Sequence, residues 1–252
     1  MNSNYKKEFE VHYYEINKYQ EATPVAIINY LEETAIAHSE FVGYRLERLK
    51  KDGYGWVLNR WSINIEKYPL WGEKILVETW PSRFEKFYAN REFKIFNGNG
   101  IEIGRASSLW IFMNTEKRRP TRIPYSLAEA YKINGEIEIV PFSKEFEKVE
   151  HSSYEKGFKV RRSDIDTNNH VNNTKYVEWL LEGIPDEVYN NYNLSCIEIV
   201  YKKETYHGSS VYVNCSDKYE KYDIIEFDHS IFDYDRSIEL ASAKTRWCRR
   251  IF

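Results

Sequence analysis

The chain has 252 residues, and a composition of 42% hydrophobic and 16% aromatic residues excludes an intrinsically disordered protein. The formal net charge of −3 lacks the excess of Lys and Arg typical of nucleic-acid-binding proteins, so we expect no nucleic-acid partner. The three cysteines have no regular spacing and predict neither a disulfide framework nor a zinc site. A polar N-terminus and the lack of any run of about 18 apolar residues predict no signal peptide and no membrane span. We therefore expect a soluble cytoplasmic protein.

The first half of the sequence predicts one amphipathic helix followed by four strands. The helix lies within residues 22–41, where Thr23 is a good N-cap and Pro24 suits the first helical position. Its apolar residues recur at helical spacing. Four later segments are rich in Val, Ile, Trp and Phe, largely alternate, and predict strands at 54–66, 73–83, 87–97 and 101–112. The sequence NGNG at 97–100 predicts a hairpin turn between the last two.

The second half repeats this order. A short helix is expected at 173–183, with an Asn cap and Gly183 at its end. Four strands are expected after it, at 194–206, 209–219, 223–233 and 238–249. The sequence IEIGRASSLW at 101–110 matches IELASAKTRW at 238–247, and YLEETA at 30–35 matches WLLEGI at 179–184. Such self-similarity predicts a duplicated unit. Leading strands are expected before each helix, at 9–16 and 157–166.

The repeat defines the expected organisation of the chain. One helix packed on a strongly curved antiparallel sheet buries one face of each element, which places each unit in the α+β class. We expect an N-terminal repeat over residues 1–113 and a C-terminal repeat over 157–252. The polar segment 114–156 is interpreted as a linker with one short helix near 125–131.

Candidate reactive groups gather only in the second copy, in the sequence DTNNHVNN at 166–173. If this segment is extended, Asp166, Asn168 and His170 share one face, because side chains alternate along a strand. The start of the next helix would add backbone N–H donors, and such an array can polarise a carbonyl group. The competing interpretation is that these residues only cap the helix, as we expect of Asn172 and Asn173. The matching segment of the first copy contains no His, and no His spacing indicates a metal site.

The stretch DIDTNNHVNNTKYVEWLLEGIP at 164–185 closely resembles the signature of the acyl-acyl carrier protein thioesterases. That resemblance spans almost the whole chain and implies a tandem hotdog fold, in which each repeat is an antiparallel sheet wrapped around a long helix. It assigns the family's functional residues to Asp166, Asn168 and His170. It also implies a carboxylate 34 residues after that His, on a strand of the second sheet, which here is Glu204. Without the resemblance, Glu204 would be interpreted as a surface residue.

The implied activity is hydrolysis of the thioester of a fatty acyl-acyl carrier protein, which releases a free fatty acid and terminates chain elongation. Glu204, with or without His170, would activate a water molecule. Asn168 and backbone N–H groups would bind the thioester oxygen, and Asp166 would orient Asn168 or the water. Thr205 stands where plant members often carry Cys, which excludes a thiol nucleophile at that position. The lack of a transit peptide favours a bacterial cytosolic member.

The expected partner is acyl carrier protein carrying a fatty acyl-phosphopantetheine, and no cofactor or metal is expected. The acyl chain would occupy the first repeat, near the helix at 24–37 and Trp56, Trp61 and Trp80. The basic residues that would steer the acidic carrier are Arg118, Arg119, Arg161, Arg162, Lys202 and Lys203.

Three alternatives stay open at this point. They are an acyl-coenzyme A thioesterase, a hotdog dehydratase and a non-catalytic acyl-binding regulatory module. The sequence fixes neither the preferred acyl chain length nor the oligomeric state, for which a homodimer is one option.

Overall fold

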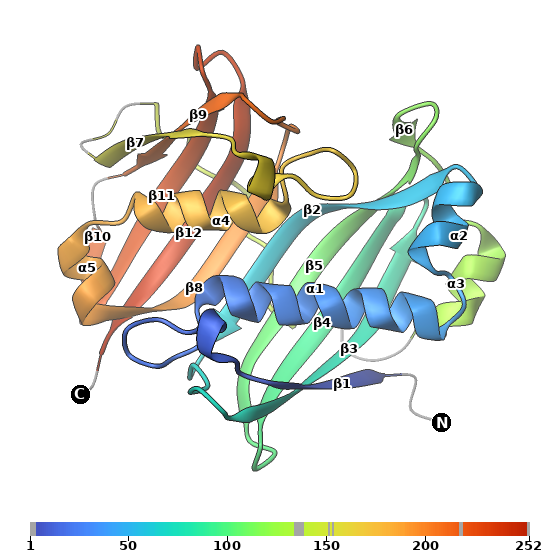
Figure 1. The fold of residues 1–252 in the computed structure, drawn as a ribbon, viewed down its shortest axis with the longest axis horizontal. Coiled ribbons are helices and arrows are strands. Elements are labelled where there is room, and N and C mark those ends of the chain that lie inside the picture. The colour runs from blue at the N-terminus through green and yellow to red at the C-terminus, as the bar shows by residue number, and fades with distance from the viewer. Residues whose placement is uncertain (1–3, 134–138, 151, 153, 217–218, 251–252) are drawn as a thin grey trace. The chain divides into compact units, whose positions relative to one another are not determined.

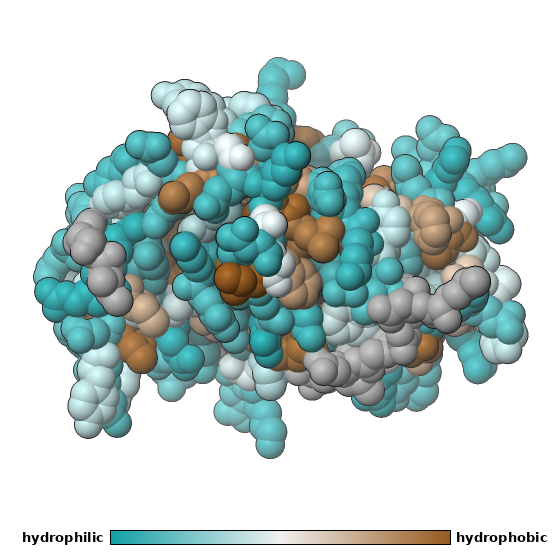
Figure 2. All heavy atoms as spheres, turned by 90° about the horizontal axis from the view of Figure 1, so that it is seen from below, coloured by the Kyte–Doolittle hydropathy of each residue, from teal (hydrophilic) through white to brown (hydrophobic). Residues whose placement is uncertain are grey.

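The computed structural model describes residues 4–133, 139–150, 152, 154–216 and 219–250 (Figure 1). The chain divides into two compact units, Met1–Phe142 and Ser143–Phe252, and the division falls inside the segment interpreted as a linker. No helix within these described ranges is long and apolar enough to cross a membrane. The face in Figure 2 is mainly hydrophilic, with hydrophobic residues in small separate groups, as expected for a chain with 30% charged residues.

The first unit contains a five-stranded antiparallel sheet in the order β1-β3-β4-β5-β2. Its strands are β1 (Tyr5–Glu10), β2 (Tyr54–Ile65), β3 (Lys74–Glu85), β4 (Tyr88–Asn97) and β5 (Glu102–Asn114), and a two-residue β6 (Arg119–Pro120) pairs with β5. The four strands predicted after the helix are confirmed with small shifts at their ends. The leading strand predicted at 9–16 is wrong in position, because β1 ends at Glu10 and Tyr13–Glu15 form a 3-10 turn, η1.

The long helix α1 (Pro24–Phe41) lies across the inner face of this sheet (Figure 1). The Thr23 side chain accepts a hydrogen bond from the backbone N–H of Ala26 at 3.1 Å, and Pro24 occupies the first helical position, as the sequence predicts. The buried stripe of the helix includes Ile27 and Leu31, which are 1% and 0% exposed. Burial of this stripe against the sheet, worth roughly 1.5–3 kcal/mol for each large apolar side chain, fixes the helix there.

Not every tryptophan of the first sheet faces α1. Trp61 is fully buried and packs on Phe93, the residue of β4 that lies opposite Ala106. Trp80 is also buried, but its ring contacts Lys94, and side chains alternate along β3 so that Thr79 points inward instead. The expectation that Trp80 lies beside the helix is therefore wrong.

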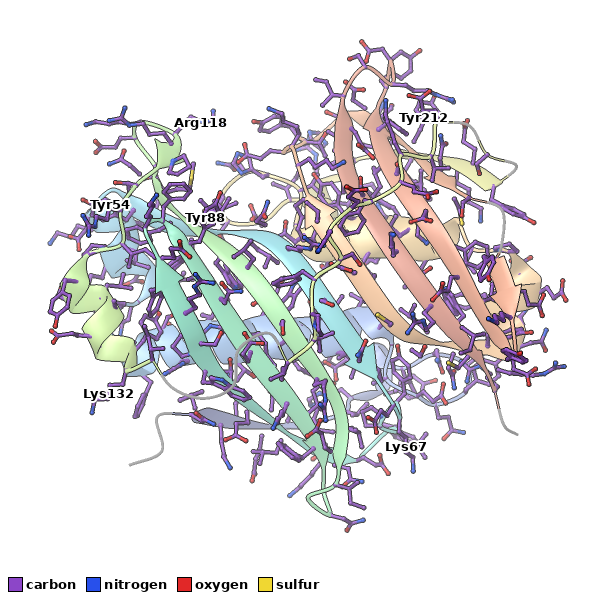
Figure 3. All side chains as sticks on the ribbon, turned by 180° about the vertical axis from the view of Figure 1, so that it is seen from behind. Tyr54, Lys67, Tyr88, Arg118, Lys132 and Tyr212 are labelled. Atoms are coloured by element: carbon purple, nitrogen blue, oxygen red, sulfur yellow. The ribbon has the colours of Figure 1, made fainter. Side chains whose placement is uncertain are left out.

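A second apolar cluster closes one end of the first sheet. It comprises Leu49, Ala89, Phe112, Ile123, Leu127 and Tyr131, from the strands and from two short helices. These helices are α2 (Leu46–Lys51), which was not predicted, and α3 (Tyr125–Tyr131), which was. Figure 3 shows Tyr54 and Tyr88 at this end of the sheet and Lys132 at the end of α3. Tyr54 stacks on Phe112 with ring centroids 5.2 Å apart, so the cluster continues to the surface.

The second unit repeats the connectivity of the first, with the sheet order β8-β12-β11-β9-β7. Its strands are β7 (Tyr154–Lys159), β8 (Tyr192–Tyr201), β9 (Ser210–Cys215), β11 (Ile224–Asp233) and β12 (Glu239–Arg249), and β10 (Tyr219–Lys221) pairs with β11. The predicted helix is confirmed as α4 (Asn173–Glu182), which lies across this sheet, and a short α5 (Asp186–Asn191) follows it (Figure 1).

Two predicted strands beside the candidate site are too long, and the strand expected at 209–219 also ends early, at Cys215. The strand expected at 157–166 corresponds to β7, which ends at Lys159 and is followed by a 3-10 turn, η2 (Arg162–Asp164). The strand expected at 194–206 ends at Tyr201, and residues 202–209 form a loop. Both errors fall beside the candidate reactive residues, where polar side chains compete with regular backbone pairing.

Residues 139–142 pack on the outer face of the first sheet. The fully buried Glu92 of β4 accepts hydrogen bonds from the hydroxyls of Ser82 and Ser107 and from the backbone N–H of Ile139. The Ser107 hydroxyl in turn accepts the N–H of Val140 at 3.0 Å. Buried polar groups need such partners, and residues 139 and 140 add one backbone donor each to Glu92 and Ser107.

The outer face of the second sheet is covered in the same way by residues 143–150. Glu198 of β8 accepts hydrogen bonds from the backbone N–H and the hydroxyl of Ser143. Ser230 accepts the N–H of Val149 at 3.0 Å, and the Asn214 amide donates to the carbonyl groups of Val149 and Glu150. Parts of the predicted linker are thus integral layers of the two units.

Candidate active site

Residues 165–171 form a tight turn immediately before α4. Ile165 and Val171 pair in an isolated antiparallel bridge, and the N–H of Asp166 donates to the carbonyl of His170 at 2.8 Å. Asn169 has φ 64°, a left-handed conformation that Asn tolerates better than most residues. The extended strand expected for DTNNH is therefore wrong. Asp and Asn side chains hydrogen-bond to nearby backbone groups, and this favours a turn over a strand.

The Asp166 carboxylate organises the turn from within. Its Oδ1 accepts the backbone N–H groups of Asn168 at 2.8 Å and His170 at 3.2 Å, and its Oδ2 accepts the Asn168 side-chain amide at 3.3 Å. An amide nitrogen carries two hydrogens, so Asn168 retains one for another acceptor. Asp166 and Asn168 are brought together as predicted, although a turn places them and not strand alternation.

His170 and Glu204 form the charged centre of the site. The Nε2 atom of His170 lies 3.3 Å from Oε2 of Glu204, and the two side chains are 29% and 42% exposed. The family resemblance implies that Glu204 lies on a strand. Glu204 lies instead in the loop between β8 and β9. Because this loop leaves the sheet, the carboxylate is accessible to solvent and avoids the desolvation penalty of a buried charge.

Backbone hydrogen bonds hold the two loops in register. The N–H of Val171 donates to the carbonyl of Thr205 at 3.1 Å, so the residues that precede this pair, His170 and Glu204, lie side by side. The Tyr176 hydroxyl, on α4, donates to the carbonyl of Lys203 at 3.3 Å. Burial, together with the Glu204 charge, raises the pKa of Tyr176, which keeps this hydroxyl protonated as a donor.

The start of α4 is capped by Asn172, as predicted. The Asn172 side chain accepts the N–H of Thr174 at 2.9 Å, and its carbonyl accepts the N–H of Lys175. These two first-turn donors are therefore used by the cap. Within the described part of the chain, the N–H of Asn173 has no acceptor, and it is the donor that this helix start leaves for a ligand. Asn173 is the first helical residue and not a cap.

Sequence reasoning missed Asp164. This carboxylate is fully buried, accepts the backbone N–H of Arg161 at 2.7 Å, and lies 3.3 Å from the Arg161 guanidinium. The carbonyl of Asp164 accepts the N–H of Asn172 at 2.8 Å, which closes the loop at the start of α4. The sequence pattern that could have identified Asp164 is an acidic residue three positions after Arg161, which is the spacing of a capping box.

The first unit contains the same loop without the reactive groups. Asn17 takes the place of Asp166: its N–H donates to the carbonyl of Glu21 at 2.8 Å, and its Oδ1 accepts the N–H groups of Tyr19 and Glu21. Gln20 has φ 64°, like Asn169. The duplication has therefore kept the backbone of the turn.

The second loop is also duplicated. Ala22 donates its N–H to the carbonyl of Pro69 at 2.8 Å, as Val171 does to Thr205. By this register Glu21 stands at the position of His170, and Tyr68 at that of Glu204. At these equivalent positions the second unit carries the imidazole and the carboxylate that form the 3.3 Å contact, and the first unit carries Glu21 and Tyr68 instead.

The arrangement in the second unit is suited to hydrolysis of an activated carbonyl compound. A carboxylate and an imidazole share one contact and are accessible, which are the parts needed to accept a proton from water. A fixed amide donor lies on the same turn as the imidazole and can stabilise a developing oxyanion.

Comparisons with known proteins agree with this chemistry. Residues 2–131 match the acyl-ACP thioesterase N-terminal domain, and residues 147–249 match the C-terminal domain. The chain is 30% identical to the palmitoyl-acyl carrier protein thioesterase of Gossypium hirsutum over 96% of its own length and 63% of that protein's. It is 31% identical to oleoyl-acyl carrier protein thioesterase 2 of Arabidopsis thaliana, covering 79% of this chain and 59% of the relative. The chain thus spans about three fifths of the length of these relatives.

Solved structures show the same fold over the whole chain. An acyl-ACP thioesterase from Bacteroides thetaiotaomicron superposes with a TM-score of 0.87 at 25% identity, covering 97% of this chain and 98% of that one. The 12:0-ACP thioesterase from Umbellularia californica has a TM-score of 0.85 at 24% identity and covers 99% of each chain. The two units are hotdog repeats of the α+β class, and the chain belongs to the acyl-ACP thioesterase family.

Proposed function

We propose that this protein hydrolyses the thioester of fatty acyl-acyl carrier protein and releases a free fatty acid and the carrier thiol. The observation that supports it most directly is the 3.3 Å contact between His170 and Glu204 beside the amide of Asn168. The family match supplies the substrate class. The printed names of the relatives describe carrier-protein thioesterases with several acyl chains, so the chain length stays open.

In the proposed reaction, Glu204 accepts a proton from a water molecule as the water attacks the thioester carbonyl. His170 contacts the same carboxylate oxygen and is placed to share or return this proton to the leaving thiolate. Both side chains are partly exposed, which gives a water molecule access to them.

Asn168 is the proposed donor to the thioester oxygen. Its amide is oriented by Asp166 and carries a second hydrogen for the substrate. The Asp166 carboxylate accepts three donors of its own turn, which favours a role in positioning over one as the base. The N–H of Asn173, which has no acceptor among the described residues, is the candidate second donor.

Direct attack by water is favoured over a covalent acyl-enzyme intermediate. Thr205, the residue next to Glu204, is only 5% exposed, and its carbonyl is engaged by Val171. Its hydroxyl has no imidazole partner among the described residues, and an unactivated hydroxyl is a weak nucleophile.

We propose that the acyl chain lies in the first repeat, between α1 and the inner face of its sheet. The apolar stripe of α1 and the inward-facing Trp61 and Phe93 provide an apolar lining. The predicted boundaries, 1–113 for this repeat, 114–156 for the linker and 157–252 for the catalytic repeat, remain part of the proposal.

The assignment is tested by Glu204→Gln and His170→Ala. Each variant is expected to lose about 10²–10⁴-fold in rate, the usual size of an acid–base contribution. The duplication provides matched controls, because Tyr68→Phe and Glu21→Gln change the equivalent positions of the first unit and should keep the rate. Full activity in both His170→Ala and Glu204→Gln would refute the site.

The substrate is tested with a panel of acyl chains, each presented on carrier protein and on coenzyme A. Faster release from the carrier supports the proposal. Faster release from coenzyme A would keep the chemistry and favour the alternative acyl-coenzyme A thioesterase. Binding without release would favour the regulatory module.

Docking of the acidic carrier is proposed to involve Arg162 and Lys203. Both are exposed beside the site, and neither has an ion-pair partner in the part of the chain that the structure describes. Lys202 and Arg161 are less available, because they pair with Glu239 and Asp164. Arg118 and Arg119 remain candidates in the first unit. Charge reversal at Arg162 should slow turnover of carrier-bound substrate while leaving that of the coenzyme A thioester unchanged.

The cytoplasmic location is also part of the proposal. The thiols of Cys196, Cys215 and Cys248 are free, which fits a reducing compartment. The homodimer stays a prediction, and light scattering in solution would test it.

A further inference from the structure

We propose that Tyr206 is a positioning residue for the Glu204–His170 pair. This inference rests on the proposed function. The Tyr206 hydroxyl donates to Oε2 of Glu204 at 3.3 Å, the same oxygen that lies 3.3 Å from Nε2 of His170. The Tyr206 ring meets the His170 ring edge to face, with centroids 5.3 Å apart and planes at 73°. One side chain thus contacts both members of the pair.

The pair needs such a support because it is exposed. A glutamate side chain has several rotatable bonds, and in a solvent-accessible loop it samples many rotamers unless other groups restrain it. The hydrogen bond from a phenol to a carboxylate is charge-assisted. At 3.3 Å the bond from Tyr206 is longer than usual, so its restraint on the carboxylate is modest. An edge-to-face contact gives the imidazole a preferred ring orientation. Together they favour the arrangement in which Glu204 and His170 touch.

Tyr206 itself is fixed by its backbone. It follows Thr205, whose carbonyl accepts the N–H of Val171, and its own carbonyl accepts the N–H of Ser209 at 3.2 Å. Gly208, with φ 83°, completes this turn into β9. Its side chain is 46% exposed, so core packing does not explain the choice of a tyrosine.

The duplicated loop provides an internal comparison. Pro69 corresponds to Thr205 through the shared backbone hydrogen bond, so Leu70 corresponds to Tyr206. Leu70 is 43% exposed, close to the exposure of Tyr206, yet it has no hydroxyl. The phenol therefore occurs in the copy that has a carboxylate and an imidazole to hold, and an aliphatic side chain suffices in the other.

The experiment compares Tyr206→Phe, which removes only the hydroxyl, with Tyr206→Leu, which installs the residue of the first copy. We expect kcat to fall about 10-fold in Tyr206→Phe and further in Tyr206→Leu, because small displacements of reacting groups are costly. KM should stay within about twofold, because a positioning residue acts on the reacting groups and not on substrate binding. Tyr222→Phe, at an 85% exposed tyrosine of the same unit, is the matched control.

A double-mutant cycle separates positioning from general stability. If Tyr206 acts through Glu204, then Tyr206→Phe should cause no further loss of kcat in a Glu204→Ala background. Additive losses of kcat in the double variant would overturn the inference. A wild-type kcat in Tyr206→Phe, together with an inactive Glu204→Ala, would overturn it as well. Either result leaves the proposed function intact. Full activity in Glu204→Ala and His170→Ala would instead refute the proposed function, and the inference with it.

Discussion

His170 lies 3.3 Å from Glu204 because the residues that follow them, Val171 and Thr205, share a backbone hydrogen bond. The first unit keeps the same bond between Ala22 and Pro69 but has neither reactive side chain. The register of the two loops therefore does not depend on the reactive side chains. The two units differ at these positions in their side chains and share the backbone arrangement.

Asn168→Ala should reduce kcat by about 10²–10³-fold, the usual effect of removing one oxyanion donor. The Asp166 contacts to the backbone N–H groups of residues 168 and 170 do not involve the deleted amide, so the turn should persist. Steady-state kinetics with carrier-bound substrate measures the effect. Tyr19→Ala, at the equivalent position of the first unit, is the control, and an equal loss in both variants would contradict the assignment.

The two helix caps should differ in their effect on activity. Asn172→Ala and Thr23→Ala each remove a side-chain acceptor at a helix N-terminus, which costs about 1 kcal/mol in the free energy of unfolding. Denaturant unfolding should show similar losses for both. Only Asn172→Ala should also lower kcat, since α4 begins beside the catalytic turn. Equal kcat values in the two variants would count against this placement of the site.

Stability should fall in acid because two histidines are buried as neutral groups. Burial lowers the pKa of His38 and of His229 to about 3, and the Arg91 charge contributes at His38. Between pH 6.5 and about 3 the unfolded chain binds protons that the folded chain does not, so the free energy of unfolding falls as the pH falls. Each histidine contributes up to about 1.4 kcal/mol per pH unit in this window.

The contribution of His229 can be isolated by replacing it with phenylalanine. Phe93 occupies the matching strand position in the first unit, opposite Ala106, as His229 lies opposite Ala243. Urea unfolding of the wild type and of His229→Phe at several pH values between 7 and 4 measures the two slopes. The slope of the variant should be smaller by about one proton. An unchanged slope would show that His229 is not the group that titrates.

Glu92→Leu should destabilise the first unit by about 2–4 kcal/mol, because it leaves buried donors without an acceptor. The donors are the hydroxyls of Ser82 and Ser107 and the N–H of Ile139. Glu92→Gln keeps the shape and one acceptor oxygen and should cost less. Thermal unfolding of both variants tests this order, and equal midpoints would argue against the role of the carboxylate.

The fold was largely predictable because the sequence patterns are strong and occur twice. Thr23 and Pro24 mark the start of α1, and alternation marks β2 to β5 and β11 to β12. The short helix α2 was missed because its six residues carry no side-chain cap and few apolar positions. The strand ends at Lys159 and Tyr201 were missed because the polar residues that follow them favour turns and loops over backbone pairing, and the alternation pattern does not reveal where this begins.

The site was predictable in its residues and less so in its geometry. Asp166, Asn168 and His170 are close in sequence and any compact loop brings them near one another. Glu204 is distant in sequence, and only the family resemblance pointed to it. Tyr206 was missed because its two contacts depend on a loop register that no local pattern encodes. Alternation along an extended segment, which puts residues 204 and 206 on one side, was the available signal.

The hydrogen bonds from residues 139–150 to Glu92, Glu198, Ser230 and Asn214 have a practical consequence for protein engineering. A fragment of the N-terminal unit that stops after α3 would expose the Glu92 carboxylate and the hydroxyls of Ser82 and Ser107, which are buried in the intact unit. Such a fragment should aggregate or fold poorly. A usable fragment has to extend to Phe142. Affinity tags and fluorescent proteins are better inserted at the 97–100 hairpin, where Gly98, Asn99 and Gly100 are exposed.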